Sequence, residues 1–540
     1  MSRLAATETP LADGFDYVIV GAGSAGCVLA NRLTEDPRTR VLLVEAGGTD
    51  RHPLIHVPAG FLRLLDHPRL TWGLRTEPDP DTADRAILFP RGKGLGGSSS
   101  INGLLHVRGQ PEDYDHWARL GNRGWSFADV LPYFRKSESW EGDDPWRGRD
   151  GPISVRRLTE RPPLCEAIIA AGRDLGLPYL DDINGPSQAG IGYYQQTRQG
   201  RWRASAARAY LAPALKRPNL AVLLGAHVRR IRFEGRRAVG IEYDRDGRIG
   251  TATAAREVIL AAGVVGSPHL LQLSGVGAPE ALKSAGIGVT HALPGVGQNL
   301  QDHYVVRLCY RVSKPVTLNE RARGLSLVRE MAKFAFRGTG VLTYSAALVG
   351  AFVRTRAESA TPDVQYVIAP GSFKGGRLGE LDDFPGLTCG CWQMRPESRG
   401  SVEAKSPDPR EAPAIRPRYL SDAADREAIV AGLEFARRLC AAPALAPYRD
   451  AEVVPGPAVN SADELLDYAR RNGSTVYHAV GTCQMGIHAR AVVDDRLRVR
   501  GLGGLRVIDA SVMPTITSTN TNATTIMIAE KGADLVRERA

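Results

Sequence analysis

The feature that most constrains the fold lies near the N-terminus, where an apolar run leads into a glycine-rich turn. Residues 15–20 read FDYVIV, residues 21–26 read GAGSAG, and residues 27–33 have helical spacing. A second apolar run, residues 41–44, ends at Glu45. Strand, Gly-x-Gly-x-x-Gly turn, helix, strand and terminal acid in this order predict a βαβ unit that binds a dinucleotide.

Each glycine of this turn has its own expected role. Gly21 permits the tight turn, Gly23 lets the backbone approach a pyrophosphate, and Gly26 allows close packing of the helix. The phosphates then meet the free N–H groups and the positive end of the helix dipole. Glu45 can accept hydrogen bonds from ribose hydroxyls and would repel a 2′-phosphate. The sequence therefore predicts FAD or NAD.

Length and composition bound the other possibilities. The chain has 540 residues, 43% of them hydrophobic and 24% charged, which excludes a small binding module and a disordered chain. The formal net charge is +10, but arginines are mixed with acids along the whole sequence, so no nucleic-acid partner is predicted. Seven scattered cysteines without a CxxC pair predict a reducing compartment and no metal site.

Neither a secretory signal nor a transmembrane helix is expected. Residues 1–14 lack an apolar core, and the apolar stretch 338–353 contains three glycines. That stretch is also shorter than the roughly 20 residues of a spanning helix. We expect a cytoplasmic protein, with peripheral membrane association left open.

The remaining sequence predicts an α/β fold with an insertion. Apolar runs at 219–224, 226–233, 239–243 and 257–263 resume the first sheet. Residues 306–477 mix strand-like runs (364–368, 387–394) with amphipathic helical patterns (325–336, 425–439), which is typical of an α+β module. The prediction is a Rossmann-like FAD-binding domain assembled from residues 15–155, 201–305 and 478–540. The α+β substrate-binding domain, with a mainly antiparallel sheet, would comprise residues 156–200 and 306–477.

Four separated segments together resemble the glucose-methanol-choline (GMC) family of flavoprotein oxidoreductases. They are the fingerprint, PRGKGLGGSSSING at 90–103, residues 267–277, and YHAVGTCQMG at 477–486 with its C-terminal sequel. They span nearly the whole chain, and the nearest resemblance is to the choline-dehydrogenase-like branch of bacterial alcohol dehydrogenases and oxidases. The resemblance implies FAD. Some oxidases of the family link the flavin to a histidine, but the matching position here is Ile101, so noncovalent FAD is expected.

The Gly-Gly-Ser-Ser-Ser loop offers backbone N–H groups and a flat surface for a ring. The C-terminal block opens a helix, with Asn522 or Thr524 as candidate N-cap. In the resembled family this helix points its N-terminus at the flavin pyrimidine edge, where it would stabilise negative charge. By resemblance, the residues expected to contact the cofactor are Gly21, Gly23, Gly26, Glu45, Arg91, Gly97, Ser98, Asn102, Val228, Ala262, Asp509, Ala510, Asn522 and Thr525.

The same resemblance assigns the catalytic pair to His478 and Asn520. Alcohol oxidation sends a hydride to flavin N5 while a base takes the hydroxyl proton, and an imidazole has a suitable pKa without large perturbation. His478 is the expected base, and Asn520 would orient the hydroxyl. Residues 299–303, NLQDH, also match the family, and a structural role near the cofactor is expected for them.

The substrate region departs from the family pattern. Relatives often carry a Ser-Asn pair and a downstream Glu in the segment that matches 340–350, whereas Tyr344 and Leu348 are the expected substrate contacts here. Loss of a carboxylate removes the partner of a cationic headgroup. A neutral, aromatic or bulky alcohol is therefore expected in preference to choline. Choline dehydrogenase activity, a hydroxynitrile lyase, a nicotinamide dehydrogenase and a silent flavin-binding protein are the competing interpretations. The acceptor, oxygen or another oxidant, and the oligomeric state stay open.

Overall fold

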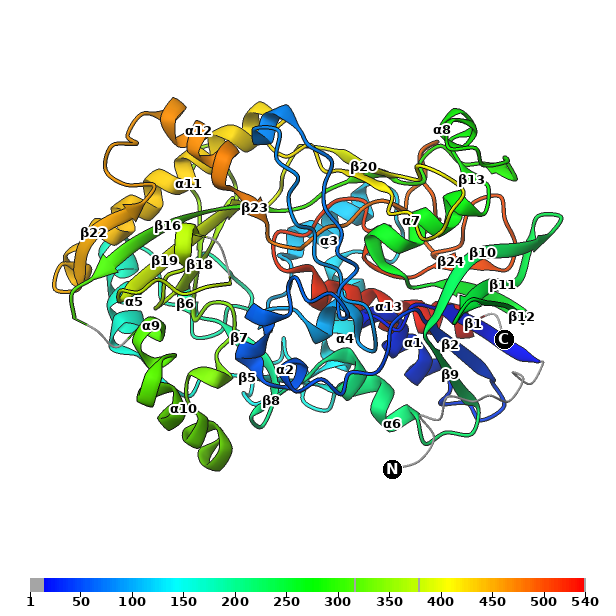
Figure 1. Ribbon diagram of the computed structural model, residues 1–540, viewed down its shortest axis with the longest axis horizontal. Helices are drawn as coiled ribbons and strands as arrows, with labels where there is room; N and C mark the ends of the chain where they lie inside the picture. The colour runs from blue at the N-terminus through cyan, green and yellow to red at the C-terminus, as the bar shows by residue number, and fades with distance from the viewer. Residues whose placement is uncertain (1–13, 315–316, 377–378, 539–540) are drawn as a thin grey trace.

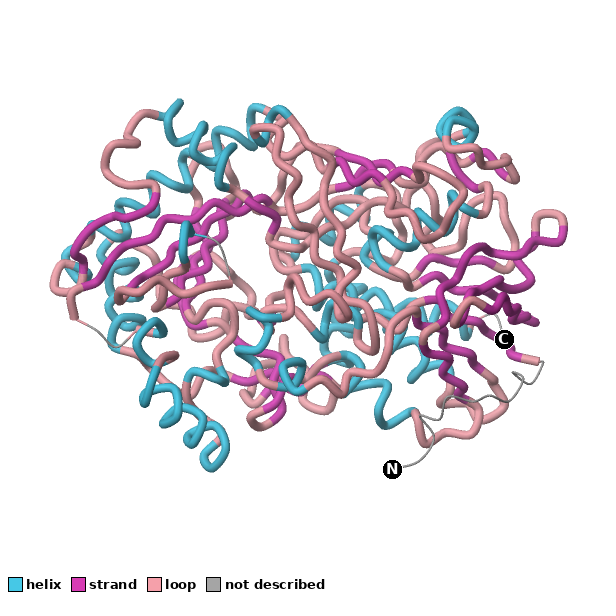
Figure 2. The backbone as a smooth tube through the Cα atoms, in the orientation of Figure 1, coloured by secondary structure: helices cyan, strands magenta, loops and turns pink. Residues whose placement is uncertain are grey.

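The computed structural model describes residues 14–314, 317–376 and 379–538. Two sheets dominate it, and they lie on opposite sides of the molecule (Figure 1). Figure 2 shows that long loops fill much of the region between them. Two hydrophobic cores accompany the sheets, one around the N-terminal βαβ unit and one around the second sheet.

The first sheet is built on the fingerprint unit. β1 (Phe15–Val20) lies between β2 (Val41–Glu45) and β12 (Arg248–Leu260) and is parallel to both. β9 (Leu220–Leu224) adds to β2 and β24 (Leu505–Val507) adds to β12, again in parallel. This parallel arrangement confirms the Rossmann-like expectation, because the carboxyl ends of the strands meet at one edge.

Further elements complete this half. β10 (Ala226–Glu234) and β11 (Arg237–Arg245) form an antiparallel ribbon on β12. Two helices from opposite ends of the chain, α1 (Ser24–Leu33) and α13 (Thr521–Arg537), pack together. α7 (Gly263–Leu273) follows β12, and α4 (Phe127–Ser137) packs on α13.

The second sheet is antiparallel, with strand order β22-β16-β19-β18-β17-β6 and β23 paired to β16. The expected strands at 364–368 and 387–394 lie at its centre. The bounds are β22 (Arg449–Val454), β16 (Tyr304–Val312), β19 (Gly386–Gln393), β18 (Val364–Ala369), β17 (Val349–Val353), β6 (Gly190–Tyr193) and β23 (Ser474–Thr475). α11 (Ala423–Ala441) packs on β19, and α12 (Ala462–Asn472) packs on α11. The mixed α/β architecture with an antiparallel sheet is confirmed.

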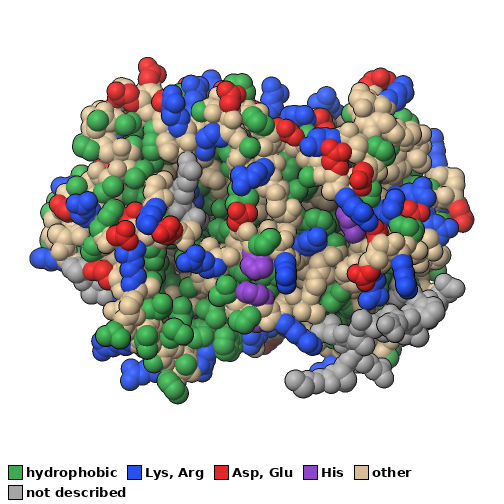
Figure 3. Space-filling model, viewed as in Figure 1, with side chains coloured by type: hydrophobic (Ala, Val, Ile, Leu, Met, Phe, Trp, Pro, Cys, Tyr) green, Lys and Arg blue, Asp and Glu red, His purple; other side chains and the backbone are tan. Residues whose placement is uncertain are grey.

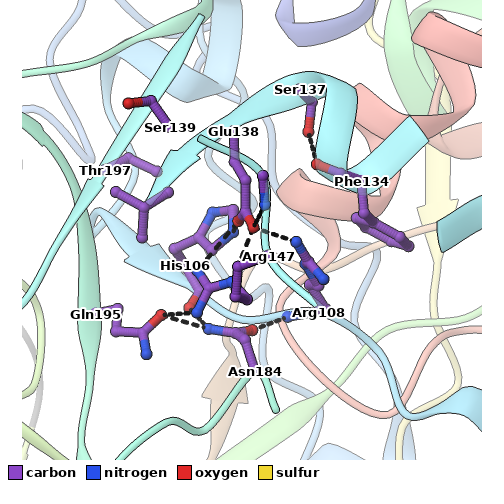
Figure 4. A network of polar contacts seen from close by, with 12 residues as sticks. His106, Arg108, Phe134, Ser137, Glu138, Ser139, Arg147, Asn184, Gln195 and Thr197 are labelled. Carbon is purple, nitrogen blue, oxygen red and sulfur yellow. Dashed lines mark hydrogen bonds and ion pairs between the residues drawn. The ribbon is translucent and has the colours of Figure 1, made fainter. Parts of the chain in front are cut away.

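A smaller sheet joins the two halves around a buried charge network. It contains β3 (Leu105–His106), β7 (Gln195–Gln199), β5 (Ile153–Arg156), β4 (Glu138–Trp140) and β8 (Trp202–Arg203). Figure 4 shows the network, in which the Glu138 carboxylate receives contacts from His106, Arg108 and Arg147. Burial alone would raise the pKa of Glu138, but the two arginines and the hydrogen bond from His106 hold it well below its ordinary value. Residues 156–200 supply strands to both this sheet and the second one, and the division into two domains stays a prediction.

Other helices, turns and strands lie outside the three sheets described so far. The helices are α2 (Pro53–His56), α3 (Pro111–Arg119), α5 (Pro163–Asp174), α6 (Ala212–Ala214), α8 (Pro279–Ser284), α9 (Leu318–Arg321), α10 (Gly324–Arg337), and the short turns η1 (Pro58–Arg63), η3 (Gly97–Ser100) and η5 (Val341–Thr343). The strands are β13 (Val276–Gly277), β14 (His291–Ala292), β15 (Gln298–Leu300), β20 (Gly400–Glu403) and β21 (Ala414–Arg416). Among the described residues, no helix has both the length and the apolar character required to cross a bilayer.

Candidate active site

A cavity of about 400 Å³ begins at the carboxyl ends of the parallel strands and reaches the second sheet. Both predicted catalytic residues and all the predicted cofactor residues except Gly26 line it. Further lining residues come from the start of α7, from β16, β18 and β19, and from the first turn of α13. The cavity therefore lies where ligands bind in open α/β sheets, outside the carboxyl ends of the strands.

The glycines of the fingerprint allow backbone segments to touch. Gly21 has φ +101°, and a Cβ atom there would lie 2.6 Å from the carbonyl oxygen of Ala261. A Cβ on Gly26 would lie 1.8 Å from the Gly21 carbonyl oxygen, so this residue packs α1 against the turn instead of lining the cavity. Gly97 has φ +50° and its Cβ would lie 2.7 Å from Gly23 Cα. A side chain at any of these three positions would push the cavity walls apart.

Glu45 organises the backbone at the end of β2. Its carboxylate accepts hydrogen bonds from the N–H groups of Ala22 (2.9 Å), Gly47 (2.8 Å) and Gly94 (3.0 Å). Burial raises the pKa of Glu45, while these three donors favour its charged form. The carboxylate thus holds the fingerprint turn and the loop before Gly97 together at the cavity wall.

Other predicted cofactor residues also support the wall. The Asp509 carboxylate accepts hydrogen bonds from Gly263 N–H (2.9 Å) and from the hydroxyls of Ser267 (2.6 Å) and Ser511 (2.5 Å). Asn102 Oδ1 accepts one from Arg203 Nη1 at 2.6 Å. These contacts fix the start of α7 and the loop after η3.

The N-terminus of α13 faces the cavity without a side-chain cap. The helix begins at Thr521 with Asn520 as N-cap, so the expectation of Asn522 or Thr524 at that position is wrong. The amide of Asn522 instead accepts a hydrogen bond from Ser24 Oγ at 2.8 Å. Because no side chain caps the helix, its first N–H groups remain available to a ligand.

His478 lies at the second-sheet end of the cavity, where its ring is held at both nitrogens. Its Nδ1 is 3.0 Å from Nδ1 of His303, and its Nε2 is 2.9 Å from Nδ2 of Asn520. The His478 backbone N–H donates to Asp302 at 2.8 Å. Ring, backbone and neighbouring amide therefore fix one orientation of the imidazole.

The hydrogen-bond chain sets the tautomer of His478. Nε2 of His303 is 2.8 Å from the Met394 carbonyl oxygen, which can only accept, so that nitrogen carries a hydrogen. In a neutral imidazole Nδ1 of His303 is then an acceptor, and Nδ1 of His478 must be its donor. The lone pair of His478 is consequently on Nε2, which faces Asn520.

Both imidazoles are held in the neutral form. Burial lowers the pKa of His303 to about 4. Burial, and secondarily the nearby His303 and Arg91, lower the pKa of His478 well below its ordinary value. At neutral pH His478 is thus an unprotonated base.

Asn520 is oriented by a second chain. Tyr194 donates its hydroxyl hydrogen to the Tyr366 carbonyl at 2.7 Å and accepts from Nε2 of Gln365 at 2.9 Å. Nε2 of Gln365 also donates to Asn520 Oδ1 at 3.3 Å. The amide nitrogen of Asn520 is therefore directed to His478.

Sequence reasoning did not identify His303, Asp302 and Gln365 as parts of this site. The NLQDH match was the available signal for the first two, while Gln365 lies in a strand with no local mark of function. Tyr344 and Leu348, expected at the substrate, are buried in the second core and are absent from the cavity lining, which contains Ala346 of the same segment. The Tyr344 hydroxyl donates to Glu160 at 2.5 Å. Their contact with substrate stays a prediction.

The second-sheet side of the cavity is mainly apolar and carries one cation. Val367, Ala369, Thr388 and Trp392 line it from the second sheet, together with Arg307. No hydrogen bond or ion pair of the Arg307 guanidinium joins it to another described residue. The acids that line the cavity are Glu45, Glu411 and Asp509, and none of them belongs to the second sheet.

The lining fits FAD, the cofactor that the sequence implies. The side chain of Arg91 has two buried nitrogens, Nε and Nη2, without a hydrogen-bond partner among the described residues. A cofactor oxygen would satisfy them. Gly23 presents bare backbone to the cavity, and the uncapped α13 supplies free N–H groups. No group of three or more potential metal ligands occurs in the described part of the chain.

Comparisons with known proteins agree with this geometry. Residues 15–305 and 396–529 match the two family models described as GMC oxidoreductase. The chain is 44% identical over 534 residues to oxygen-dependent choline dehydrogenase of Escherichia coli O139:H28, covering 97% of this chain and 95% of the relative.

Solved structures give the same result. Pyridoxine 4-oxidase from Mesorbium loti has a TM-score of 0.88 at 33% identity, covering 96% of this chain and 99% of its own. A formate oxidase variant from Aspergillus oryzae RIB40 has a TM-score of 0.92 at 26% identity, covering 98% and 99%. The chain therefore belongs to the GMC oxidoreductase family, and it is an FAD-dependent enzyme that oxidises CH–OH donors.

Proposed function

We propose that this enzyme oxidises a primary or secondary alcohol to an aldehyde or ketone, with His478 as the base. The observation that carries the proposal is the hydrogen-bond chain from Met394 through His303, which leaves the lone pair of His478 on Nε2 at the cavity. When bound, FAD supplies the hydride acceptor, its N5 atom.

The chain's own residues handle the proton. The alcohol O–H donates to Nε2 of His478, while Nδ2 of Asn520 donates to the alcohol oxygen. As the hydride leaves the carbinol carbon, the proton moves to Nε2, because an alkoxide releases hydride far more readily than an alcohol. His303 accepts the Nδ1–H hydrogen bond of the resulting imidazolium. Asn520 holds the oxygen in place.

Noncovalent cofactor binding is part of the proposal. Ile101 stands at the position of the flavin-linked histidine in some relatives, and it lines the cavity with an aliphatic side chain. Denaturation of the purified enzyme should release all of its flavin into solution, and yellow precipitated protein would contradict this.

The base assignment is tested with His478→Ala. The variant should retain FAD but lose several orders of magnitude in the rate of anaerobic flavin reduction by alcohol, since general-base catalysis is worth about 10²–10⁴-fold. Stopped-flow bleaching of the flavin band measures this rate. His488→Ala, at an exposed histidine, is the control and should reduce at the wild-type rate. Near-normal reduction in His478→Ala would overturn the assignment.

A neutral, aromatic or bulky alcohol is the proposed substrate class. Arg307 supports this choice because a cation on the substrate side of the cavity repels a quaternary ammonium group, and no carboxylate of the second sheet offsets it. The apolar lining favours an uncharged hydrocarbon or aromatic body.

Choline is the second candidate, favoured by the 44% identity to choline dehydrogenase. Under the proposal, Arg307→Glu should raise kcat/KM for choline relative to benzyl alcohol at least about tenfold, because reversing one partly buried charge is worth at least ~1.4 kcal/mol. Arg307→Gln should give a smaller change in the same direction. Choline turnover by the wild type that equals turnover of neutral alcohols would refute the preference.

A nicotinamide dehydrogenase fits the cavity less well than an alcohol-oxidising flavoenzyme. The η3 loop and the His478–Asn520 pair have no role in a nicotinamide dehydrogenase. Purification of a colourless protein would nevertheless favour that interpretation. A hydroxynitrile lyase would cleave cyanohydrins without bleaching its flavin with any alcohol. The electron acceptor is identified by adding air or a dye to the reduced enzyme and recording which of them restores the flavin absorbance.

A cytoplasmic location is proposed as well. All seven cysteines are buried and none forms a disulfide, which suits a reducing compartment.

A further inference from the structure

The helix α10 presents an apolar face to solvent. Leu325 is 89% exposed, Val328 61%, Met331 54% and Phe336 86%. In Figure 3 hydrophobic side chains gather over the position of α10 at the lower left of the molecule, with Lys and Arg at the edge. We call these four residues, together with Arg329 and Arg337, the α10 patch.

The exposure of this face is fixed by the packing of the opposite face. Phe334 is buried and its ring lies edge-on to Trp202 with centroids 5.2 Å apart. Glu330 is also buried, and its carboxylate pairs with Arg321 at 2.9 Å and with Lys333 at 2.7 Å. The helix is thus anchored through its inner side, so the α10 patch cannot turn inward without breaking these contacts.

The charges of the patch have one sign. The one acid of α10, Glu330, is buried, whereas Arg329 and Arg337 are exposed. No ion pair to a described residue involves either arginine. Arg323, just before the helix, is paired with Asp383 at 2.9 Å. Exposed apolar groups beside unpaired cations fit a surface with a hydrophobic interior and a negatively charged boundary.

We propose that the α10 patch docks on the surface of an anionic lipid bilayer. The apolar side chains enter the acyl boundary, while Arg329 and Arg337 meet lipid phosphates, which is how interfacial amphipathic helices bind. A second copy of the chain is the less suitable occupant. In a two-fold contact the same arginines face one another across the interface without acids to pair them.

The position of the patch gives docking a consequence for the cavity. α10 packs on η5, and η5 packs on η1. Phe61 of η1 lines the cavity. The helix that contacts the lipid is therefore two steps from the cavity wall, so docking brings that side of the cavity near the membrane. The docking itself does not depend on the proposed alcohol oxidation.

Vesicle co-sedimentation of the full-length, FAD-loaded enzyme tests the proposal. Vesicles of phosphatidylglycerol mixed with phosphatidylcholine should sediment the wild type, and pure phosphatidylcholine vesicles should do so at least tenfold less well. Leu325→Glu with Phe336→Glu should weaken binding at least about tenfold, because two apolar anchors become charged. Arg329→Glu with Arg337→Glu should weaken it at least about 25-fold at low salt, at about fivefold for each arginine lost.

Matched control variants distinguish docking through the α10 patch from nonspecific electrostatic or hydrophobic adsorption to the vesicles. Ile487→Glu alters another exposed apolar side chain, and Arg232→Glu with Arg248→Glu reverses two exposed arginines of the β10–β12 ribbon. These variants should bind like the wild type, and every variant should keep its flavin absorbance. Equal binding by the α10 variants and controls would overturn the proposal. Absence of vesicle binding by the wild type would also overturn the proposal. A dimer on size-exclusion chromatography that Leu325→Glu with Phe336→Glu disrupts would then identify a second copy of the chain as the occupant.

Discussion

Two buried imidazoles share one hydrogen bond at the centre of this enzyme, and only one of them faces the cavity. In the proposed mechanism His303 contributes no atom to the reaction, but through its contact with the Met394 carbonyl it decides which nitrogen of His478 carries the lone pair. It is a positioning residue. Its main partner lies 91 positions away in the sequence, which explains why a short motif could not indicate the role.

Substitution of His303 should separate positioning from packing. In His303→Gln the side-chain amide can donate to Met394 and accept from His478, so we expect it to retain most of the wild-type rate of flavin reduction. His303→Leu removes both contacts and should lower the rate at least about 10²-fold, as loss of a tautomer-fixing partner does in other enzymes. Equal rates in the two variants, measured at saturating alcohol, would show that His303 only fills space.

The pH dependence of stability offers a second measure of the same pair. An unfolded histidine takes a proton near pH 6.5, whereas the pKa of folded His303 is about 4 and that of His478 is also lowered. Below pH 6.5 the unfolded chain binds more protons, so the free energy of unfolding falls as the pH drops from about 6.5 toward 4. Thermal unfolding of His303→Gln should show a shallower decline than the wild type. Parallel curves would contradict the shift.

Elements whose residues lie close together in the sequence could be predicted, whereas contacts between distant segments could not. The unit of β1, α1 and β2 was predictable because its whole signal lies within about thirty residues of sequence. The order of the second sheet was not, since it brings residues as far apart as β6 and β22 into one layer. The expected helices and strands of that region exist, but alternation alone cannot decide which faces meet the cavity. Tyr344 and Leu348, expected at the substrate from the family resemblance, are buried in the second core and do not line the cavity, and their contact with substrate stays a prediction.

The turn after β2 supplies a matched pair for testing close backbone approach. A Cβ on Gly47 would lie 2.4 Å from the Gly94 backbone nitrogen, whereas a Cβ on Gly48 would meet no atom within 4 Å. Gly47→Ala should separate the N–H groups of Gly47 and Gly94, two of the three that Glu45 holds. It should therefore weaken FAD retention and lower Tm by several degrees, at about 2–4 °C for each kcal/mol in larger domains. Gly48→Ala should match the wild type in dialysis and thermal unfolding. Identical behaviour would mean that the contact has no effect.

At the scale of the whole molecule, a buried ion pair joins α1 near the start of the sequence to α13 near its end. Arg32 of α1 and Glu530 of α13 form a two-pronged ion pair at 2.8 Å, and Tyr210 donates to the same carboxylate at 2.8 Å. Glu530 has no exposed side-chain surface. The stability of this half of the protein therefore depends on residues separated by 498 positions.

Glu530→Gln should remove the buried carboxylate that pairs with Arg32 and lower the free energy of unfolding by about 3–5 kcal/mol. Glu35→Gln, which removes a more exposed partner of the same arginine, should change it by less than about 1 kcal/mol. Chemical denaturation of the two variants measures the difference. If both variants lose the same free energy of unfolding, the buried ion pair does not stabilise the contact between α1 and α13 more than the exposed one does.

That contact between α1 and α13 also fixes an order of events during synthesis. The fingerprint turn emerges from the ribosome before β24 and the α13 turn, which complete the cavity. A nascent chain consequently has a dinucleotide fold with one strand and one wall missing, and it cannot enclose FAD. Enclosure of the cofactor must therefore follow synthesis of β24 and the first turn of α13.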